Sequence, residues 1–115
     1  MTNTEIAVAF SNVEFEKTYQ YISDKAELTV VEENKFIGKK AIIANCEKVS
    51  SYFKSVTTDF RMQNVISDGN KVVINGTAEF LRNNKRVAYV SARDIYDFSS
   101  TGQIQNIISY CIQAK

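Results

Sequence analysis

The sequence predicts an α+β fold in which three N-terminal helices pack inside a strongly curved, mostly antiparallel sheet. Apolar residues at helical spacing dominate the first 53 residues, whereas four long β-type segments joined by short turns fill the rest. The chain has 115 residues, of which 44% are hydrophobic, and this is enough to bury one core. No linker, repeat or low-complexity tract interrupts it, so we expect a single domain over residues 1–115.

Two helices are expected near the N-terminus, over residues 3–10 and 12–22. In both stretches apolar side chains recur at intervals of three and four, as on the buried face of a helix. Ser11 followed by Glu14 matches the capping-box pattern, in which the serine caps the new helix and the glutamate bonds back to it. The second helix is therefore expected to begin near residue 12.

A β-hairpin and a third helix follow. The segment 25–31 has the composition of a strand, and 33–37 reads as a short return strand. After Gly38, apolar residues recur at i, i+4, i+7 and i+11, which is typical of a helix facing a core. This predicts a helix over 39–53, whose buried stripe is Ile42, Cys46, Val49 and Phe53.

The second half predicts four consecutive strands. Turn-forming residues separate them, and consecutive strands joined by tight turns must run antiparallel. Long antiparallel strands twist, so the sheet is expected to curl around the helices into a cone. The expected strands are 56–67, 70–82, 85–98 and 103–113.

The turn at 82–85 allows two registers for its hairpin. A two-residue turn would pair Val73 with Asp94, whereas a three-residue loop or one bulge would pair Ile74 with Asp94. The second register gathers the apolar residues of both strands on one face, and a one-residue slip would move every side chain to the other face. We therefore prefer the second register, which turns Asp94 toward the helices.

Asp94 is the main candidate for chemistry. A carboxylate among apolar side chains must find partners, take up a proton or sit in a wet pocket, and desolvation raises its pKa. Such a group in a concavity is a candidate acid or base, with Tyr96 or Asn64 holding an oxyanion or a water. The alternative is a structural aspartate bonded to a tyrosine hydroxyl or to a strand.

If a pocket exists, its expected lining comes from the inner faces of the sheet and of the helices. Spacing alone would equally place these side chains in an ordinary core. The candidates are Ile6, Phe10, Phe15, Tyr19, Phe53, Phe60, Met62, Asn64, Ile107, Ser109 and Cys111, together with Asp94 and Tyr96.

Several classes of function are disfavoured by composition. The net charge is +1 and no basic run appears, so we expect neither nucleic acid nor an anionic membrane as a partner. Histidine is absent, which removes the usual catalytic triads and zinc sites, and we expect no metal and no cofactor. Cys46 and Cys111 are expected to be buried thiols. With no signal peptide and no apolar span, we expect a cytoplasmic protein.

The outer face of the sheet is unusually apolar for a solvent-facing surface. Large apolar patches usually mark association, so we expect a homodimer packed through this face, with Arg93 as an interface or surface charge. The outward-facing apolar residues are Tyr89, Ile95, Ile108, Tyr110 and Ile112.

Three segments resemble one family and together cover nearly the whole chain. They are "AFSNVEFEKTYQYISDKAEL", "FIGKKAIIANCEKV" and "DGNKVVINGTAEF" with "ARDIYDFSSTGQIQNIISY". The ending "DIYDF" with Gly102 and Ile104 is the most specific piece. The sequence resembles SnoaL-like members of the nuclear transport factor 2-like superfamily, a cone-shaped α+β fold shared with ketosteroid isomerase.

The resemblance implies a fold more than a function, because the superfamily contains enzymes, ligand binders and interaction modules. Asp94 matches the strand position of the protonated aspartate in ketosteroid isomerase. The positions of that enzyme's tyrosine and base fall near Ile6 and Val30, and Glu32 and Glu33 are shifted. Steroid-type isomerisation by that set of residues is therefore disfavoured.

Three functions stay open at this point. The first is a binding protein for a small apolar ligand in the cone, and the second is an isomerase, cyclase or hydrolase that uses Asp94. The third is a dimeric interaction module with a filled cone. A cavity above about 300 Å³ would favour the first two, since ligand pockets begin near that volume.

Overall fold

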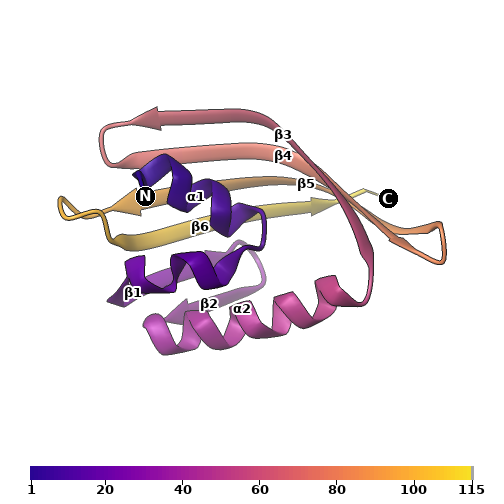
Figure 1. The fold of residues 1–115 in the computed structure, drawn as a ribbon, viewed down its shortest axis with the longest axis horizontal. Helices are drawn as coiled ribbons and strands as arrows, with labels where there is room; N and C mark the ends of the chain where they lie inside the picture. Colours follow the sequence, from indigo (N-terminus) through magenta and orange to yellow (C-terminus); the bar gives the residue numbers. More distant parts are fainter. Residues whose placement is uncertain (115) are drawn as a thin grey trace.

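The computed structural model of the protein describes residues 1–114 and confirms the α+β architecture (Figure 1). Within the described residues 1–114, two α-helices, one 3-10 helix and six strands follow one another. Their bounds are α1 Asn3–Ser11, η1 Phe15–Tyr21, β1 Ile22–Val30, β2 Asn34–Ile37, α2 Lys39–Lys54, β3 Thr57–Asp68, β4 Lys71–Arg82, β5 Lys85–Phe98 and β6 Ile104–Gln113.

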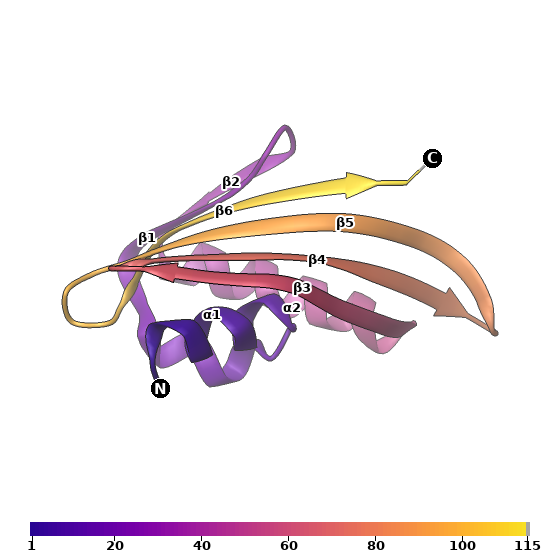
Figure 2. The same ribbon diagram turned by 90° about the horizontal axis from the view of Figure 1, so that it is seen from above.

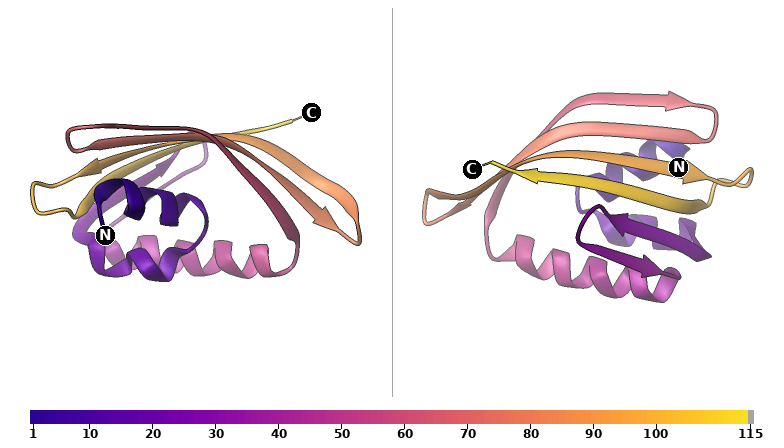
Figure 3. Two further views of the ribbon diagram at one scale, coloured as in Figure 1. Left: turned by 45° about the horizontal axis from the view of Figure 1, so that its top comes forward. Right: turned by 180° about the vertical axis from the view of Figure 1, so that it is seen from behind.

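One six-stranded sheet carries all the strands, in the order β2-β1-β6-β5-β4-β3. Only β1 and β6 are parallel, so the sheet is mostly antiparallel, as the sequence predicts. All three helices lie on its concave side, and the strands arch over them (Figure 2). In the part of the chain that the structure describes, no helix lies on the convex side (Figure 3).

The second predicted helix is wrong in extent and type. The chain is a 3-10 helix only from Phe15, because α1 ends in a Schellman motif: Val13 N–H donates to Phe10 O and Glu14 N–H to Ala9 O. Val13 has φ 65°, the left-handed conformation that a C-cap requires and glycine usually supplies. The Ser11–Glu14 capping box does not form.

A true capping box begins α1 instead. The Thr2 side chain accepts a hydrogen bond from Glu5 N–H, and the Glu5 carboxylate accepts one from Thr2 N–H. The Ser11 hydroxyl, at the C-terminal end of α1, takes no part in this cap and contacts Asp94 and Tyr96 instead.

The β4–β5 hairpin adopts the predicted register through a combination of both alternatives. Asn83 and Asn84 form a two-residue turn with φ 54° and 63°, as in a type I′ turn, and Arg82 pairs with Lys85. A bulge at Val87 then shifts the pairing. Beyond the bulge, Ile74 faces Asp94 as predicted.

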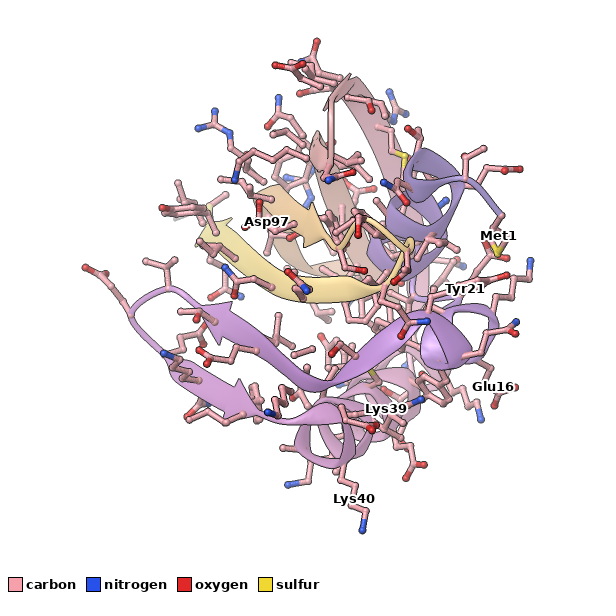
Figure 4. The ribbon with its side chains drawn as sticks, turned by 90° about the vertical axis from the view of Figure 1, so that its left-hand side faces the viewer. Met1, Glu16, Tyr21, Lys39, Lys40 and Asp97 are labelled. Carbon is pink, nitrogen blue, oxygen red and sulfur yellow. The ribbon has the colours of Figure 1, made fainter. Side chains whose placement is uncertain are left out.

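The two aspartates of β5 show the resulting alternation. Asp97, three residues after Asp94, lies on the side of the sheet away from α1 (Figure 4), where it pairs with Lys71. Asp94 therefore faces the helices, because successive side chains of a strand point to opposite faces.

A second bulge lies in β3 at Gln63. Met62 pairs with Gly76, but Asn64 pairs with Asn75, so alternation is reset between them. Bulges increase local twist and bending, and β3 to β5 curve here toward the C-terminal end of α2 (Figure 3).

The core lies between the helices and the sheet and has two parts. The larger cluster joins α1, η1, β1 and α2 to the sheet, and the smaller one lies near the C-terminal end of α2. The most deeply buried large side chains are Tyr96, Ile6, Ile22, Ile42, Ile104, Ile107 and Val72.

The two cysteines differ from each other. Cys46 is fully buried, as predicted, but Cys111 is exposed, because the end of β6 extends beyond the helices. Neither forms a disulfide. Within residues 1–114, no helix combines the length and the apolar character needed to cross a bilayer.

Candidate functional site

A cavity of about 310 Å³ remains between the two core clusters. Its walls come from the end of α1, the start of η1, the middle of α2 and the concave face of the sheet. The apolar lining is Phe10, Val13, Phe15, Leu28, Val30, Val49, Phe53, Phe60, Met62, Ile74, Ala78, Phe80, Val90, Ala92 and Ile107. The remaining lining residues are Ser11, Asn12, Glu33, Asn45, Arg61, Gly76, Thr77, Asp94, Ser109 and Cys111.

The cavity exists because small residues meet on the concave face of the sheet. Gly76 pairs with Ala92, and Ala78 lies two residues further along β4. A side chain on Gly76 is excluded by the neighbouring strand, since a Cβ there would overlap the carbonyl oxygen of Arg61 and lie 3.2 Å from Met62 Cα. The bulge in β3 brings this backbone close.

Asp94 provides a polar end to an otherwise apolar cavity. Ser109, its cross-strand partner on β6, donates a 2.7 Å hydrogen bond to Oδ1. Ser11, the last residue of α1, donates a 2.8 Å bond to Oδ2. The carboxylate is thus held by one hydroxyl from the helix and one from the sheet.

Tyr96 is attached to the same group through Ser11. Its hydroxyl lies 2.6 Å from Ser11 Oγ. Because the single Ser11 proton goes to Asp94, the tyrosine is the donor in this pair, and the bonds run from Tyr96 to Ser11 to Asp94. The Tyr96 ring is fully buried and packs edge-on against Phe10, so its hydroxyl has no access to the cavity.

Burial dominates the electrostatics of this cluster. Desolvation raises the pKa of the Asp94 carboxyl, while the hydrogen bonds from Ser109 and Ser11 hold part of that rise back. The pKa of Tyr96 is raised well above its ordinary value by burial and by the Asp94 charge, so it stays a neutral phenol. Cys111 is exposed to solvent on one side, but the atoms around the thiol desolvate it enough to raise its pKa, which disfavours the thiolate.

A neck of four residues separates the cavity from an open groove of about 340 Å³. Asn12, Val13, Phe53 and Phe60 line both spaces, and the rings of Phe53 and Phe60 stack with centroids 5.5 Å apart. The groove and the cavity are therefore adjacent, with the α1–η1 connection and these two rings between them.

Most of the predicted lining residues do surround this cavity. Four of the predicted lining residues, Ile6, Tyr19, Asn64 and Tyr96, do not, and each has a structural reason. Tyr96 is fully buried in the core, and Tyr19 packs against the core from the 3-10 helix. Asn64 is exposed on the convex face of the sheet, because the Gln63 bulge reverses which side chains of β3 point inward. The predicted residues that line the cavity are Phe10, Phe15, Phe53, Phe60, Met62, Asp94, Ile107, Ser109 and Cys111, whereas Ile6 lies within the core.

Ser11 belongs to the hydrogen-bonded cluster around Asp94, although its sequence context indicated a helix cap. Its capping-box spacing was a local signal, whereas its contacts with Asp94 and Tyr96 span more than 80 residues. Small residues on the concave face of β4 and β5, namely Gly76, Ala78 and Ala92, leave room for the cavity, but their spacing alone does not set its volume.

The site has few groups suited to a metal. Among residues 1–114, no three histidine, cysteine, aspartate or glutamate side chains lie close enough together to hold one. The Asp94 carboxyl can itself take part in hydrogen bonding, charge pairing and proton transfer.

Comparisons with known proteins agree with this geometry. A solved NTF2-like protein of unknown function from Cytophaga hutchinsonii is 32% identical, with 94% of each chain covered and a TM-score of 0.84. No protein-family model matches the sequence, and no curated protein matches it.

More distant solved structures share the fold. An LEH-like epoxide hydrolase from M. tuberculosis is 14% identical, with a TM-score of 0.73 over 95% of this chain and 81% of that one. A Jannaschia protein provisionally named a SnoaL-like polyketide cyclase is 12% identical, with a TM-score of 0.74 over 95% and 84%. The 32% identity to the Cytophaga protein over almost the full length shows that this chain belongs to the nuclear transport factor 2-like (NTF2-like) superfamily, and it has the cone fold of the SnoaL-like members.

Proposed function

We propose that the protein binds a small, largely apolar molecule in the cavity and holds its polar end at Asp94. The observation that carries this proposal is the 310 Å³ space, walled mostly by apolar side chains and lined at one side by the half-buried carboxylate of Asp94. Ligand pockets in proteins have this composition and begin near this volume. An interaction module with a filled cone would lack such a space.

The volume limits the size of the ligand. It equals the liquid volume of on the order of ten water molecules, which suits a molecule of about a dozen non-hydrogen atoms. At about 0.5 kcal/mol for each such atom, the binding free energy would be near 6 kcal/mol, a Kd of tens of micromolar.

Filling the cavity is expected to weaken binding without unfolding the protein. Ala92→Leu places three more carbons in the empty space beside Asp94. We expect 4-phenylbutan-1-ol, titrated by calorimetry, to bind the wild type and to bind the variant at least about tenfold more weakly, equivalent to 1.4 kcal/mol.

The matched control is Ser51→Leu, which adds a leucine at an exposed position of α2 and should leave binding unchanged. Thermal unfolding checks that both variants are folded. Equal binding by wild type and Ala92→Leu would contradict the proposal.

Acid–base catalysis at Asp94 is the second candidate. The raised pKa and the position in the cavity favour it. Against it, the buried Tyr96 hydroxyl is committed to Ser11 and cannot reach an oxyanion in the cavity. A pKa of Asp94 above 6, measured by carbon NMR, with turnover lost in Asp94→Asn, would favour catalysis over binding.

We further propose that the convex face of the sheet joins two copies of the chain. One row across four strands is apolar: Ile66, Val73, Ile95 and Ile108 are cross-strand neighbours. Ile66 is 58% exposed, and Tyr110 and Ile112 nearby are 41% and 69% exposed. A two-fold axis through this row would cover the same patch on both copies.

The two free thiols suit a reducing cytoplasm.

The double variant Tyr110→Lys with Ile112→Lys is expected to separate the dimer, because four added charges would meet across the two-fold axis. Sedimentation of the wild type should give about twice the 13.0 kDa mass of one chain, and the variant should give one chain. Lys85→Tyr, at the exposed hairpin tip, is the control. A monomeric wild type at 100 µM would contradict this interface, since stable dimers bury about 800 Å² per partner and persist at that concentration.

A further inference from the structure

The cavity contains negative charge without a positive partner. Its charged lining residues are Asp94, Glu33 and Arg61. Arg61 directly precedes the inward-facing Met62 in β3 and pairs with Thr77, so its side chain points to the opposite face of the sheet. There its guanidinium bonds the Asp59 carboxylate at 3.2 Å. Arg61 also lines a separate pocket together with Asp59, Thr77 and Glu79, whereas its carbonyl oxygen lies close to Gly76. No cationic side chain in the lining therefore faces the Asp94 carboxylate.

The hydrogen bonds around Asp94 also leave acceptor capacity unused. An ionised carboxylate has about four acceptor sites, and Asp94 receives one bond on each oxygen. The two donors, Ser11 and Ser109, have no second proton to offer a ligand. This end of the cavity is thus richer in acceptors than in donors, although the neutral amides of Asn12 and Asn45 lie elsewhere on the wall.

From this charge pattern we propose that the ligand is an amine: a short apolar body whose ammonium group donates to the Asp94 carboxylate. The inference rests on the proposed function, because it assigns the class of molecule that the same cavity takes. The ammonium supplies both the missing positive charge and the missing donors. A carboxylate or phosphate in its place would approach two acidic side chains with no cation to receive it.

The apolar walls strengthen this selectivity. A charge pair in a partly dry pocket interacts more strongly than the same pair in water, and a charge-assisted hydrogen bond is about twice as strong as a neutral one. We therefore expect the ammonium to bind at least about tenfold more tightly than a hydroxyl on the same body. A carboxylate on that body should bind at least about a hundredfold more weakly than the ammonium.

Glu33 in the β1–β2 turn is the other acidic residue of the lining, but Asp94 is the proposed partner of the ammonium, so the charge state of Asp94 governs amine binding. Tyr96 on its own strand stays neutral, Cys111 on β6 is a thiol, and α1 contributes only the Ser11 hydroxyl. Burial raises the pKa of Asp94, and a bound ammonium would lower it. Amine affinity should consequently fall as the pH drops through this pKa.

The test compares three molecules that share one body: 4-phenylbutylamine, 4-phenylbutan-1-ol and 4-phenylbutyrate. Each is titrated by calorimetry at neutral pH into the wild type, Asp94→Asn and Asp97→Asn. Asp97→Asn is the matched control, because it removes the same charge from the same strand but on the convex face. We expect the wild type and Asp97→Asn to rank the amine first and the carboxylate last.

In Asp94→Asn the amine should lose at least tenfold in affinity, while the alcohol should change by less than threefold. Equal affinity of amine and alcohol for the wild type, or an amine preference that persists in Asp94→Asn, would overturn the inference and leave the proposed function standing. Failure of all three molecules to bind would overturn both.

Discussion

Gly76→Ala is expected to lower the free energy of unfolding by about 3 kcal/mol, at the upper end of overpacking effects. The added Cβ would overlap the backbone carbonyl oxygen of Arg61 and lie 3.2 Å from Met62 Cα. Both neighbours are main-chain atoms of β3, so no side-chain rotation can relieve the overlap. β3 must move away from β4 or the bulge at Gln63 must rearrange.

Urea unfolding followed by circular dichroism measures the loss. The control is Ala92→Gly, the reverse change at the residue paired with Gly76. It should cost no more than about 1 kcal/mol, the ordinary price of glycine in a strand. If Gly76→Ala lowered the free energy of unfolding no more than Ala92→Gly does, the close approach of β3 to β4 at Gly76 would be contradicted.

Ser11→Ala is expected to lower the free energy of unfolding by about 2 kcal/mol, because it leaves a buried donor without an acceptor. The fully buried Tyr96 hydroxyl has Ser11 as its hydrogen-bond partner, and Asp94 would keep only Ser109. The pKa of Asp94 should also rise further, since one of the two bonds that lower it is gone. Ser109→Ala removes the other bond but leaves Tyr96 paired, so it should cost less.

A double-mutant cycle isolates this effect. In a Tyr96→Phe background no buried hydroxyl remains to be orphaned, and Ser11→Ala should cost about 1 kcal/mol less than in the wild type. Additive losses from the two substitutions would contradict the chain of hydrogen bonds from Tyr96 through Ser11 to Asp94. Carbon NMR of Asp94 in each variant supplies a readout that a purely structural defect would not move.

The strands of the second half were predictable because alternation of apolar and polar residues is a strong constraint. Only one register of β4 and β5 gathers their apolar residues on one face, and the structure reaches it through the bulge at Val87. The α1–η1 region was not predictable in the same way. Val13 in a left-handed conformation ends α1 and gives a 3-10 helix where apolar spacing indicated an α-helix.

The lining of the site shows the same division. Residues on regular strands and helices were placed correctly, as with Ile107 and Phe53. Asn64 was misplaced because a bulge in β3 has no signature in composition, and it reverses which side chains face inward. Ser11 was missed because its partners are remote in the chain.

By itself, the sequence determined that this chain forms a helix-filled curved sheet and that Asp94 faces the helices. Periodicity carries that information, because burial of one face requires it. Only the tertiary structure decided that the interior is partly empty and that Ser11 and Ser109 hold the carboxylate there. Cavity volume and long-range hydrogen bonds depend on how closely separate elements approach, and no local pattern of residues records that distance.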